Sequence, residues 1–286
     1  MRYRNAALCL VALLLAACKP DAPATDAAAP ATAPQATPVA EAPATEPAAP
    51  PAPAVDAAFA KGMPYADVRR RLLDAGWLPL RDPACRENVG GEARVCGALP
   101  ETESCSGDGH CVMHFANASE AQRMRITAYG PYDRWNTPGE QAAFAVQSWE
   151  RSPVTAAAAA PACPAQDFDA FLQRFAADEA IERAFTAPLV EVAELGGGED
   201  GDDTVMVYVA GPQYTGFNVV RGSDGYHFVD AEGARDAAPL PLQVSAAGEN
   251  VRDVRYRYGM SEGNSYRFEA RDGCWYLTQD PEPPSP

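Results

Sequence analysis

Apolar and polar residues recur with a helical period in residues 163–185 of the chain. The apolar positions on one side of this segment are Phe168, Phe171, Leu172 and Phe175. A spacing of i, i+3, i+4 and i+7 is typical of a helix that buries one face, so this aromatic stripe is predicted to belong to a hydrophobic core rather than to a ligand site. Asp178 is suited to cap a second short helix, which carries Ile181 and Phe185 on its buried side.

The period changes to two in the rest of the C-terminal half, which predicts strands. The strand-like runs are 204–211 (TVMVYVAG), 216–222 (GFNVVRG), 225–231 (GYHFVDA), 253–259 (DVRYRYG), 265–270 (SYRFEA) and 274–279 (CWYLTQ). Residues 223–225 and 272–273 are typical of tight hairpin turns. In 253–259 the aromatic and arginine side chains alternate, so the sheet is predicted to have one charged face and one aromatic face.

An earlier segment, residues 62–77 (GMPYADVRRRLLDAGW), predicts a helix with both ends marked. Pro64 suits the first helical position, where a missing N–H costs nothing. The apolar positions with helical spacing are Val68, Leu72 and Ala75. Gly76 fits the left-handed position after the last turn, and Trp77 then folds back onto the helix.

Four strand-like runs follow this helix, separated by glycine, proline and asparagine. They are 77–80 (WLPL), 111–115 (CVMHF), 123–129 (RMRITAY) and 143–149 (AFAVQSW). The chain is therefore predicted to be an α+β protein made of two small domains, each with one or two helices packed on an antiparallel sheet.

The N-terminal residues have the pattern of an export signal, in which two arginines precede an apolar run at residues 6–15. A helix that stays in the membrane needs about 20 apolar residues, which disfavours the alternative of a retained spanning anchor. Residues 15–18 (LAAC) resemble the lipobox of bacterial lipoproteins. That resemblance implies a lipid on the Cys18 thiol, cleavage before Cys18 and a fatty acid such as palmitate on the new amine. Lys19 favours sorting to the outer membrane. The protein is expected to face the periplasm, and exposure on the cell surface is the alternative.

Residues 19–55 consist almost entirely of Ala, Pro, Thr and a few acids. Such a segment has too little apolar area to offset its ordering entropy and is predicted to be a disordered tether. A second low-complexity run, 153–162, separates the two halves, and its flanking prolines favour a linker over a helical extension. The predicted organisation is a signal peptide at 1–17, a lipidated cysteine and tether at 18–56, a disulfide-containing domain at 57–152, a linker at 153–162, a cone-like domain at 163–280 and a disordered tail at 281–286.

The formal net charge of −16 excludes some classes of partner. An acidic chain without a basic stripe is a poor ligand for nucleic acid. The basic cluster at residues 69–71 fans around the predicted helix and is predicted to be solvated. Membrane contact is therefore expected through the lipid anchor alone, and the partner is expected to be an envelope protein or a small ligand.

Six cysteines remain after the signal peptide and Cys18. An even number of cysteines in an exported chain predicts disulfides. In the first predicted domain we favour Cys85–Cys96 and Cys105–Cys111 among the three possible connectivities. In the second, Cys163 and Cys274 have only each other as partners and are predicted to bond.

Metal binding is the alternative for part of this cysteine set. Two sulfurs and two nitrogens could come from Cys105, His110, Cys111 and His114. Adjacent His110 and Cys111 would have to converge on one ion, and thiolates oxidise in an exported chain. The cysteines are therefore predicted to form disulfides, with no metal and no cofactor.

Each predicted domain resembles a known group of proteins. Two amphipathic helices followed by about six antiparallel strands resemble the nuclear-transport-factor-2 type of α+β cone. The DFDAFLQRFAAD and DGCWYL stretches are also similar to an uncharacterised family of bacterial exported proteins with that shape. Residues 62–64 and 76–77 resemble outer-membrane-assembly lipoproteins and β-lactamase-inhibitor-like domains, which implies a protein-binding module.

The chain carries no nucleophile elbow, HExxH motif, phosphate loop or dinucleotide fingerprint. His227, on a predicted strand, is a candidate general base inside the cone. The alternative is a partly exposed strand histidine without catalytic function. The acidic run at residues 199–203 lacks the spacing of a calcium loop. The sequence therefore favours a non-catalytic binding or interaction lipoprotein, with a periplasmic enzyme that uses His227 as the alternative.

Overall fold

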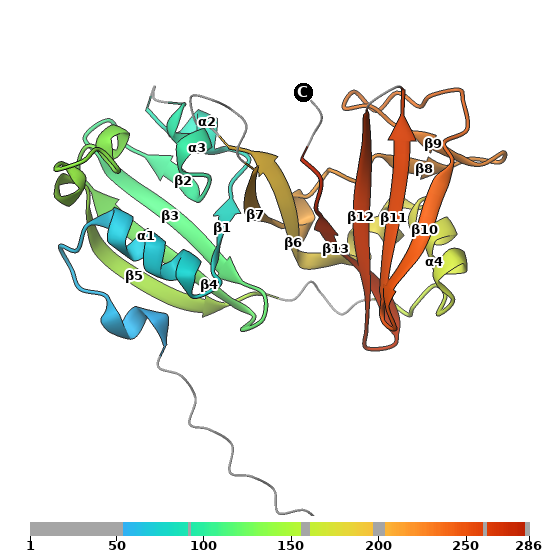
Figure 1. Cartoon of the computed structure of the whole chain (residues 1–286), viewed down its shortest axis with the longest axis horizontal. Helices are drawn as coiled ribbons and strands as arrows, with labels where there is room; N and C mark the ends of the chain where they lie inside the picture. Colours follow the sequence, from blue (N-terminus) through green and yellow to red (C-terminus); the bar gives the residue numbers. More distant parts are fainter. Residues whose placement is uncertain (1–53, 91–92, 156–160, 197–203, 260–261, 284–286) are drawn as a thin grey trace, which may run out of the picture. The chain divides into compact units, whose positions relative to one another are not determined.

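The computed structural model of the chain describes residues 54–90, 93–155, 161–196, 204–259 and 262–283 (Figure 1). The described residues all belong to one compact unit that spans residues 52–286. The predicted signal peptide, the predicted lipidation site Cys18, most of the predicted tether and the acidic run at 199–203 lie outside the described residues. Within the described ranges, no helix is long and apolar enough to cross a membrane.

The first half of the described chain contains one longer helix, several short helical turns and five strands. Their bounds are η1 Val55–Ala58, α1 Tyr65–Asp74, β1 Leu78–Arg81, α2 Cys85–Asn88, α3 Val95–Ala98, β2 Thr102–Cys105, β3 His110–Asn117, β4 Gln122–Tyr129, η2 Tyr132–Arg134, η3 Gln141–Ala143 and β5 Ala145–Pro153. The longer helix and four of the strands match the sequence prediction. The short α2, α3 and β2 were not anticipated, because four residues are too few to show a period.

Helix α1 begins and ends with local signals that the sequence carries. Pro64 is the N-cap residue, one position before the first helical position predicted for it. At the other end Gly76 has a left-handed φ of +77° and donates its N–H to the Leu73 carbonyl, while Trp77 donates to the Leu72 carbonyl. These two bonds form the Schellman arrangement that ends many helices, and they turn the Trp77 ring into the core.

Helix α1 packs on β3, β4 and β5 around a core that contains one buried carboxylate. The apolar members of this core include Tyr65, Val68, Leu72, Met113, Phe115, Met124, Ile126 and Val146. Glu101 lies among them with no exposed surface, and Arg69 Nε donates to its Oε1 at 2.6 Å. The prediction that residues 69–71 are all solvated is therefore wrong for Arg69, whose guanidinium is bound to the buried Glu101 carboxylate. Arg70 and Arg71 are exposed, as predicted.

The second half contains two helices and eight strands. Their bounds are α4 Phe168–Phe175, α5 Glu179–Ala184, β6 Thr186–Leu195, β7 Thr204–Ala210, η4 Gly211–Gln213, β8 Val219–Arg221, β9 Tyr226–Phe228, β10 Leu242–Gly248, β11 Val251–Tyr258, β12 Glu262–Arg271 and β13 Cys274–Asp280. Two of these strands, β6 and β10, were not among the six predicted runs. Strand β6 contains Pro188 and two glutamates, which weaken a strand pattern.

The cap predicted for the second of these helices, α5, is confirmed. The carboxylate of Asp178 accepts hydrogen bonds from the backbone N–H groups of Ala180 and Ile181, at 2.8 and 3.4 Å. Asp167 caps α4 in the same way through Ala170 N–H. These bonds satisfy backbone N–H groups that have no partner inside the helix. Each helix therefore begins directly after its capping aspartate.

Aromatic rings fill the space between α4 and the sheet. The predicted aromatic stripe of α4 is buried, and three of its rings contact Phe268 of β12, with centroids 5.2–6.2 Å from it. Phe217 closes the cluster by packing edge-on against Phe175. The prediction of a core stripe is confirmed, and the interior of the predicted cone is occupied here by side chains.

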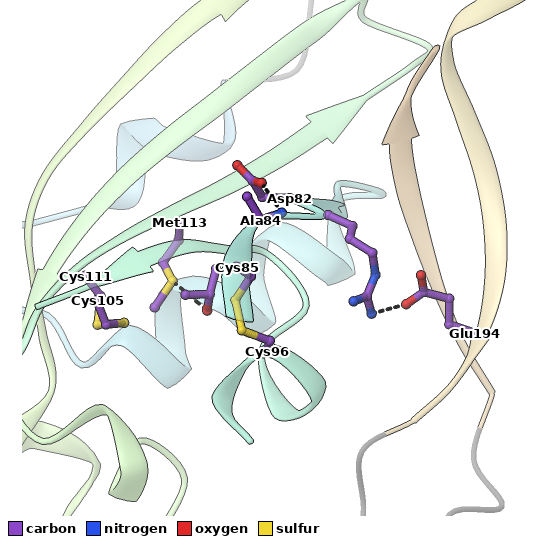
Figure 2. The surroundings of a disulfide bond; sticks show 10 residues. Asp82, Ala84, Cys85, Cys96, Cys105, Cys111, Met113 and Glu194 are labelled. Atoms are coloured by element: carbon purple, nitrogen blue, oxygen red, sulfur yellow. Dashed lines mark hydrogen bonds and ion pairs between the residues drawn. A yellow bond between two sulfur atoms is a disulfide. The ribbon is translucent and has the colours of Figure 1, made fainter. Parts of the chain in front are cut away.

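The strands form one mixed sheet in the order β10-β11-β12-β13-β6-β7-β1-β3-β4-β5, with β2 beside β3, and a separate β8–β9 hairpin (Figure 1). The sequence predicted antiparallel pairing only, but β13 pairs with β6 and β1 pairs with β7 in parallel. An ion pair between Arg81 of β1 and Glu194 of β6 lies beside the second parallel contact (Figure 2). Strands that pair in parallel come from distant parts of the chain, so no local sequence pattern predicts their pairing.

Each half has its own large hydrophobic cluster. A third, small cluster lies where β1 meets β7 and consists of Leu80, Ala116, Leu189 and Tyr208. A mixed sheet with few helices fits the predicted α+β class. The division into two domains at residues 153–162 stays a prediction.

Candidate functional site

A groove of about 480 Å³ lies over the outer face of the sheet, opposite the aromatic cluster. Strands β6, β7, β12 and β13 form one wall, and the β3–β4 turn together with Val154 forms the other. The polar residues that line this groove are Ser119, Glu191, Tyr208, Glu269, Arg271, Thr278 and Gln279. The apolar ones are Ala118, Ala121, Val154, Ala187, Pro188 and Leu189. Its volume is within the range of small-molecule and side-chain binding sites.

The polar floor of the groove follows from strand register. Tyr208 of β7 is paired with Glu191 of β6, and Glu191 is paired with Gln279 of β13. Gln279 is in turn paired with Arg267 of β12, which is paired with Asp253 of β11. Paired residues share one face of a sheet, so these five side chains form a polar row across it.

Most charges of this row and of the rest of the groove lining are already paired. Arg267 binds Asp253 through two hydrogen bonds, Nε to Oδ1 at 2.8 Å and a terminal nitrogen to Oδ2 at 3.1 Å. Arg271 donates to Glu269 Oε2 at 2.6 Å. The Glu191 carboxylate forms no ion pair or hydrogen bond with any residue that the structure describes, so it is the one lining carboxylate without a direct partner there.

Burial affects the acid–base properties of this carboxylate. Desolvation raises the pKa of Glu191, while the charge of Arg267 lowers it and that of Glu269 raises it further. Desolvation, followed by the charge of Glu191, also raises the pKa of the neighbouring Tyr208. A hydrogen bond from the Ala118 backbone N–H to the Tyr208 hydroxyl opposes this rise. A half-buried acid inside a groove is a common feature of binding and catalytic sites.

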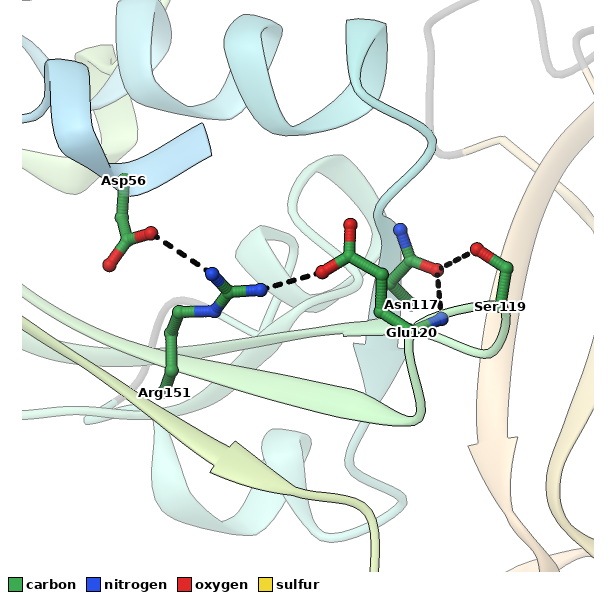
Figure 3. A network of polar contacts seen from close by, with 5 residues as sticks. All are labelled: Asp56, Asn117, Ser119, Glu120 and Arg151. Carbon is green, nitrogen blue, oxygen red and sulfur yellow. Dashed lines mark hydrogen bonds and ion pairs between the residues drawn. The ribbon is translucent and has the colours of Figure 1, made fainter. Parts of the chain in front are cut away.

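The turn that forms the second wall is held by its own polar contacts (Figure 3). Asn117 Oδ1 accepts hydrogen bonds from the Ser119 hydroxyl at 2.7 Å and from the Glu120 backbone N–H at 3.1 Å. Arg151 then links Glu120 to Asp56, at 2.6 and 3.4 Å. This wall is therefore fixed by side chains within the first half rather than by the groove itself.

The candidate base His227 lies elsewhere, in the β8–β9 hairpin. Its ring is fully buried, with Nδ1 3.0 Å from the Asp236 carbonyl oxygen and Nε2 2.9 Å from Asp224 Oδ1. The hydrogen bond from His227 lowers the pKa of Asp224. An acid does lie beside the histidine, but His227 does not line the groove, and both ring nitrogens are engaged in holding the loop.

The cysteines lie as the favoured pairings require. The sulfurs of Cys85 and Cys96 and those of Cys105 and Cys111 are at bonding distance, with Cα atoms 6.0 and 4.1 Å apart (Figure 2). Cys163 and Cys274 are paired likewise, with Cα atoms 5.5 Å apart. The Cα separations of 6.0 and 5.5 Å lie in the usual range for disulfides, that of 4.1 Å lies just below it, and all three sulfur pairs are at bonding distance, in agreement with the predicted pairing.

The four residues of the alternative metal site do not converge in the structure. Cys105 and Cys111 share their sulfurs with each other, and a bonded sulfur is not a thiolate ligand. The His110 ring packs on Tyr129, with centroids 4.5 Å apart, while His114 Nε2 lies against Glu103 Oε2. The two histidines therefore contact different residues and do not point at a common site with the cysteines.

A second cluster of perturbed groups surrounds the end of β13. Tyr214 donates a hydrogen bond to Asp280 Oδ2 at 2.8 Å, and the other oxygen of Asp280 is buried without a hydrogen-bond partner among the described residues. Burial raises the pKa of Asp280 to about 6, against the lowering effect of hydrogen bonds from Tyr214 and Asn264. Burial, helped by the charge of Glu179, also raises the pKa of Glu182 to about 7.

Sequence reasoning did not identify the groove residues. Glu191 lies on β6, a strand that was not predicted, and the other lining residues outside β6 come from five segments of the chain. Glu191 and Glu194 are three positions apart on that strand and therefore lie on opposite faces, so β6 has no regular alternation that marks its groove face.

No protein-family model matches this chain, and no curated protein sequence matches it. Among solved structures, the chain is similar to an NTF2-like protein from Bacteroides fragilis, with 11% sequence identity and a TM-score of 0.29. The match covers 57% of this chain and 60% of that protein, so this chain spans less than two thirds of that protein's length. The class named in that protein's description is the one that residues 163–280 are predicted to resemble.

Proposed function

We propose that this protein is a lipid-anchored envelope lipoprotein that acts as a non-catalytic binding module and takes its ligand in the groove. One observation carries this proposal. The groove combines about 480 Å³ of volume, apolar walls and a half-buried carboxylate, Glu191, that has no direct partner among the described residues. Concave sites with apolar walls and a few convergent polar groups are where proteins commonly hold ligands.

The N-terminal sequence supports the location in this proposal. A lipobox-like LAAC stretch and an Ala/Pro-rich tether suit a binding module held at a distance from a membrane. The negative net charge favours a partner that is not nucleic acid. An envelope protein with an exposed segment and a small soluble ligand are both compatible with a groove of this size.

The alternative of a periplasmic enzyme depends on His227. Asp224 lies beside it, as a general base would require. Its ring nitrogens are both occupied, and the ring does not line the groove where a substrate would sit. The binding proposal therefore has the better geometric support.

A photo-crosslinking experiment tests the groove as a ligand site. A benzoylphenylalanine replaces Ala118, an exposed residue on the groove wall, in the full chain expressed in its native envelope. Tyr129 is the matched control position, because it is exposed on β4 and does not line the groove. A defined adduct by mass spectrometry at position 118 and none at position 129 supports the proposal. The absence of any adduct at 118, or the same adducts at both positions, refutes it.

A further inference from the structure

The charges of the groove indicate what kind of ligand it takes. We infer that the groove binds a primary ammonium group on an aliphatic stem, such as a lysine side chain or a free alkylamine, with the ammonium against Glu191. This inference rests on the proposed function of the groove. It goes beyond that function by naming the chemical class of the ligand.

The first step is the balance of charge inside the groove. Glu269 and Arg271 neutralise each other at 2.6 Å, and Arg267 behind the lining is occupied by Asp253. One negative charge, on Glu191, is left without a direct counterion among the described residues. A ligand that carries one positive charge completes this arrangement, whereas an anion would face Glu191 with no free cation among the lining residues.

The second step is the environment of Glu191. Its half-buried carboxylate has lost part of its hydration, and this desolvation is what raises its pKa. A carboxylate that is partly removed from water interacts more strongly with a nearby charge than an exposed one does. Binding of a cation therefore adds a direct ion pair to the longer-range attraction that Arg267 already exerts on Glu191.

The third step distinguishes an ammonium from a guanidinium. An ammonium has three donors, and oxygen acceptors on Glu191, Thr278 and Gln279 all line the groove. A guanidinium can also pair with the Glu191 carboxylate through two parallel hydrogen bonds. The ammonium is favoured because its three donors point in different directions and can reach Thr278 and Gln279 as well as Glu191. The Tyr208 ring adds an aromatic surface of the kind that attracts ammonium groups.

The fourth step concerns the rest of the ligand. Leu189, Val154 and Pro188 form an apolar wall beside Glu191, which suits a methylene stem. Beyond this wall lies a smaller recess of about 290 Å³ that shares these three residues and is lined by Arg123 and Arg183. Arg123 repels a cation there, and Arg183 is already paired with Glu179, so the ammonium end is expected on the Glu191 side. The net charge of −16 further raises the local concentration of cations around the protein.

Calorimetric titration of the full chain tests the inference. The probes are 1-aminopentane with 1-pentanol as its neutral match, and N-acetyl-lysine methylamide with N-acetyl-norleucine methylamide as its neutral match. Binding of at least one amine, and of neither neutral compound, is expected, with affinity that falls as salt is added. Binding of the lysine derivative alone indicates a peptide ligand, and binding of aminopentane alone indicates a free amine.

Two variants locate the interaction. Glu191→Gln keeps the shape of the side chain and removes its charge, and is expected to weaken amine binding by about tenfold or more. Glu249→Gln removes an exposed charge outside the groove and is expected to leave binding unchanged. Tyr208→Leu is a second groove variant, expected to weaken amine binding because it removes the aromatic surface beside Glu191. Circular dichroism and the melting temperature verify that each variant is folded.

Three outcomes overturn the inference. They are the absence of amine binding, equal binding of an amine and its neutral match, and an affinity that Glu191→Gln leaves unchanged. If any of these occurs while the crosslink at position 118 is present, the groove binds a ligand of another chemistry and only the ammonium inference fails. If the crosslink is also absent, the proposed function fails with it.

Discussion

The Tyr65 hydroxyl donates a hydrogen bond of 2.7 Å to Glu101, a residue 36 positions away, and neither residue is exposed to solvent. This bond joins the first turn of α1 to the residue that precedes β2. Burial, followed by the charge of Glu101, raises the pKa of Tyr65 well above its ordinary value, so the hydroxyl stays a donor. A buried carboxylate thus ties the helix to the sheet through Tyr65 and Arg69.

Tyr65→Phe is expected to lower the free energy of unfolding by about 2 kcal/mol, because it removes a hydrogen bond to a buried charged group. Urea denaturation measures the change. Tyr129→Phe is the control, since Tyr129 is exposed and its loss of a hydroxyl is expected to change stability by less than about 0.5 kcal/mol. Equal effects of the two substitutions would contradict the stabilising contribution of the Tyr65–Glu101 bond.

The disulfides differ in the length of chain that they close, and this predicts different contributions. Cys163–Cys274 closes a loop of 111 residues and Cys105–Cys111 one of 6. In the chain-entropy model, replacing both cysteines by serine is expected to cost about 4.7 kcal/mol for the long loop and about 2 kcal/mol for the short one. Urea denaturation of the two double variants of the full chain measures this difference. A Cys163→Ser/Cys274→Ser variant as stable as the parent would show that the bond does not form.

The buried Asp280 predicts a dependence of stability on pH. The folded protein keeps this proton up to about pH 6, whereas the unfolded chain releases it near pH 4. The unfolded state therefore binds fewer protons between these values, so this group's contribution to stability falls as pH rises through them and is then constant.

Asp280→Asn removes this titration, so its stability relative to the parent is expected to rise between pH 4 and pH 7, by up to about 3 kcal/mol. Thermal unfolding of both proteins across that pH range measures the difference. Glu232→Gln, at an exposed position, is the matched control. A difference between Asp280→Asn and parent that is the same at every pH would exclude the titration of Asp280 as its cause.

His227 is expected to be structural. His227→Leu should lower the free energy of unfolding by about 2 kcal/mol, because it leaves the Asp236 carbonyl without its partner inside the loop. Amine binding in the groove should be unchanged, because His227 does not line it. Urea denaturation and calorimetric titration check the two expectations. A variant that is fully stable but has lost binding would support a functional histidine.

Lipidation of Cys18 is the prediction on which the envelope location depends. Cys18→Ala is expected to shift the protein from the membrane pellet to the soluble fraction, or to leave its signal uncleaved, because the acylated residue is lost. Cys9→Ala is the matched control, since Cys9 lies inside the predicted signal peptide and leaves with it. Membrane fractionation and the mass of the mature N-terminus check this. Unchanged fractionation of Cys18→Ala would refute the lipobox interpretation.

The elements that the sequence determined by itself are those with local causes. The cap at Asp178 depends on residues within one helical turn, as does the Gly76–Trp77 helix end, so each could be predicted from its own segment. The period of α4 marks its buried face in the same way. The Cys163–Cys274 pairing follows from the number of cysteines rather than from geometry.

The groove and the buried carboxylates were decided only by tertiary structure. Strand β6 acquires its place from parallel pairing with β13, which local sequence does not encode, and this pairing puts Glu191 in the polar row of the groove. The local sequence around Arg69 predicts a solvated side chain, because its partner Glu101 comes from a different segment of the chain. Whether a charged side chain is exposed, paired or left unpaired in a groove depends on the neighbours that the fold gathers around it. Those neighbours lie tens of residues away, beyond the reach of any periodic pattern.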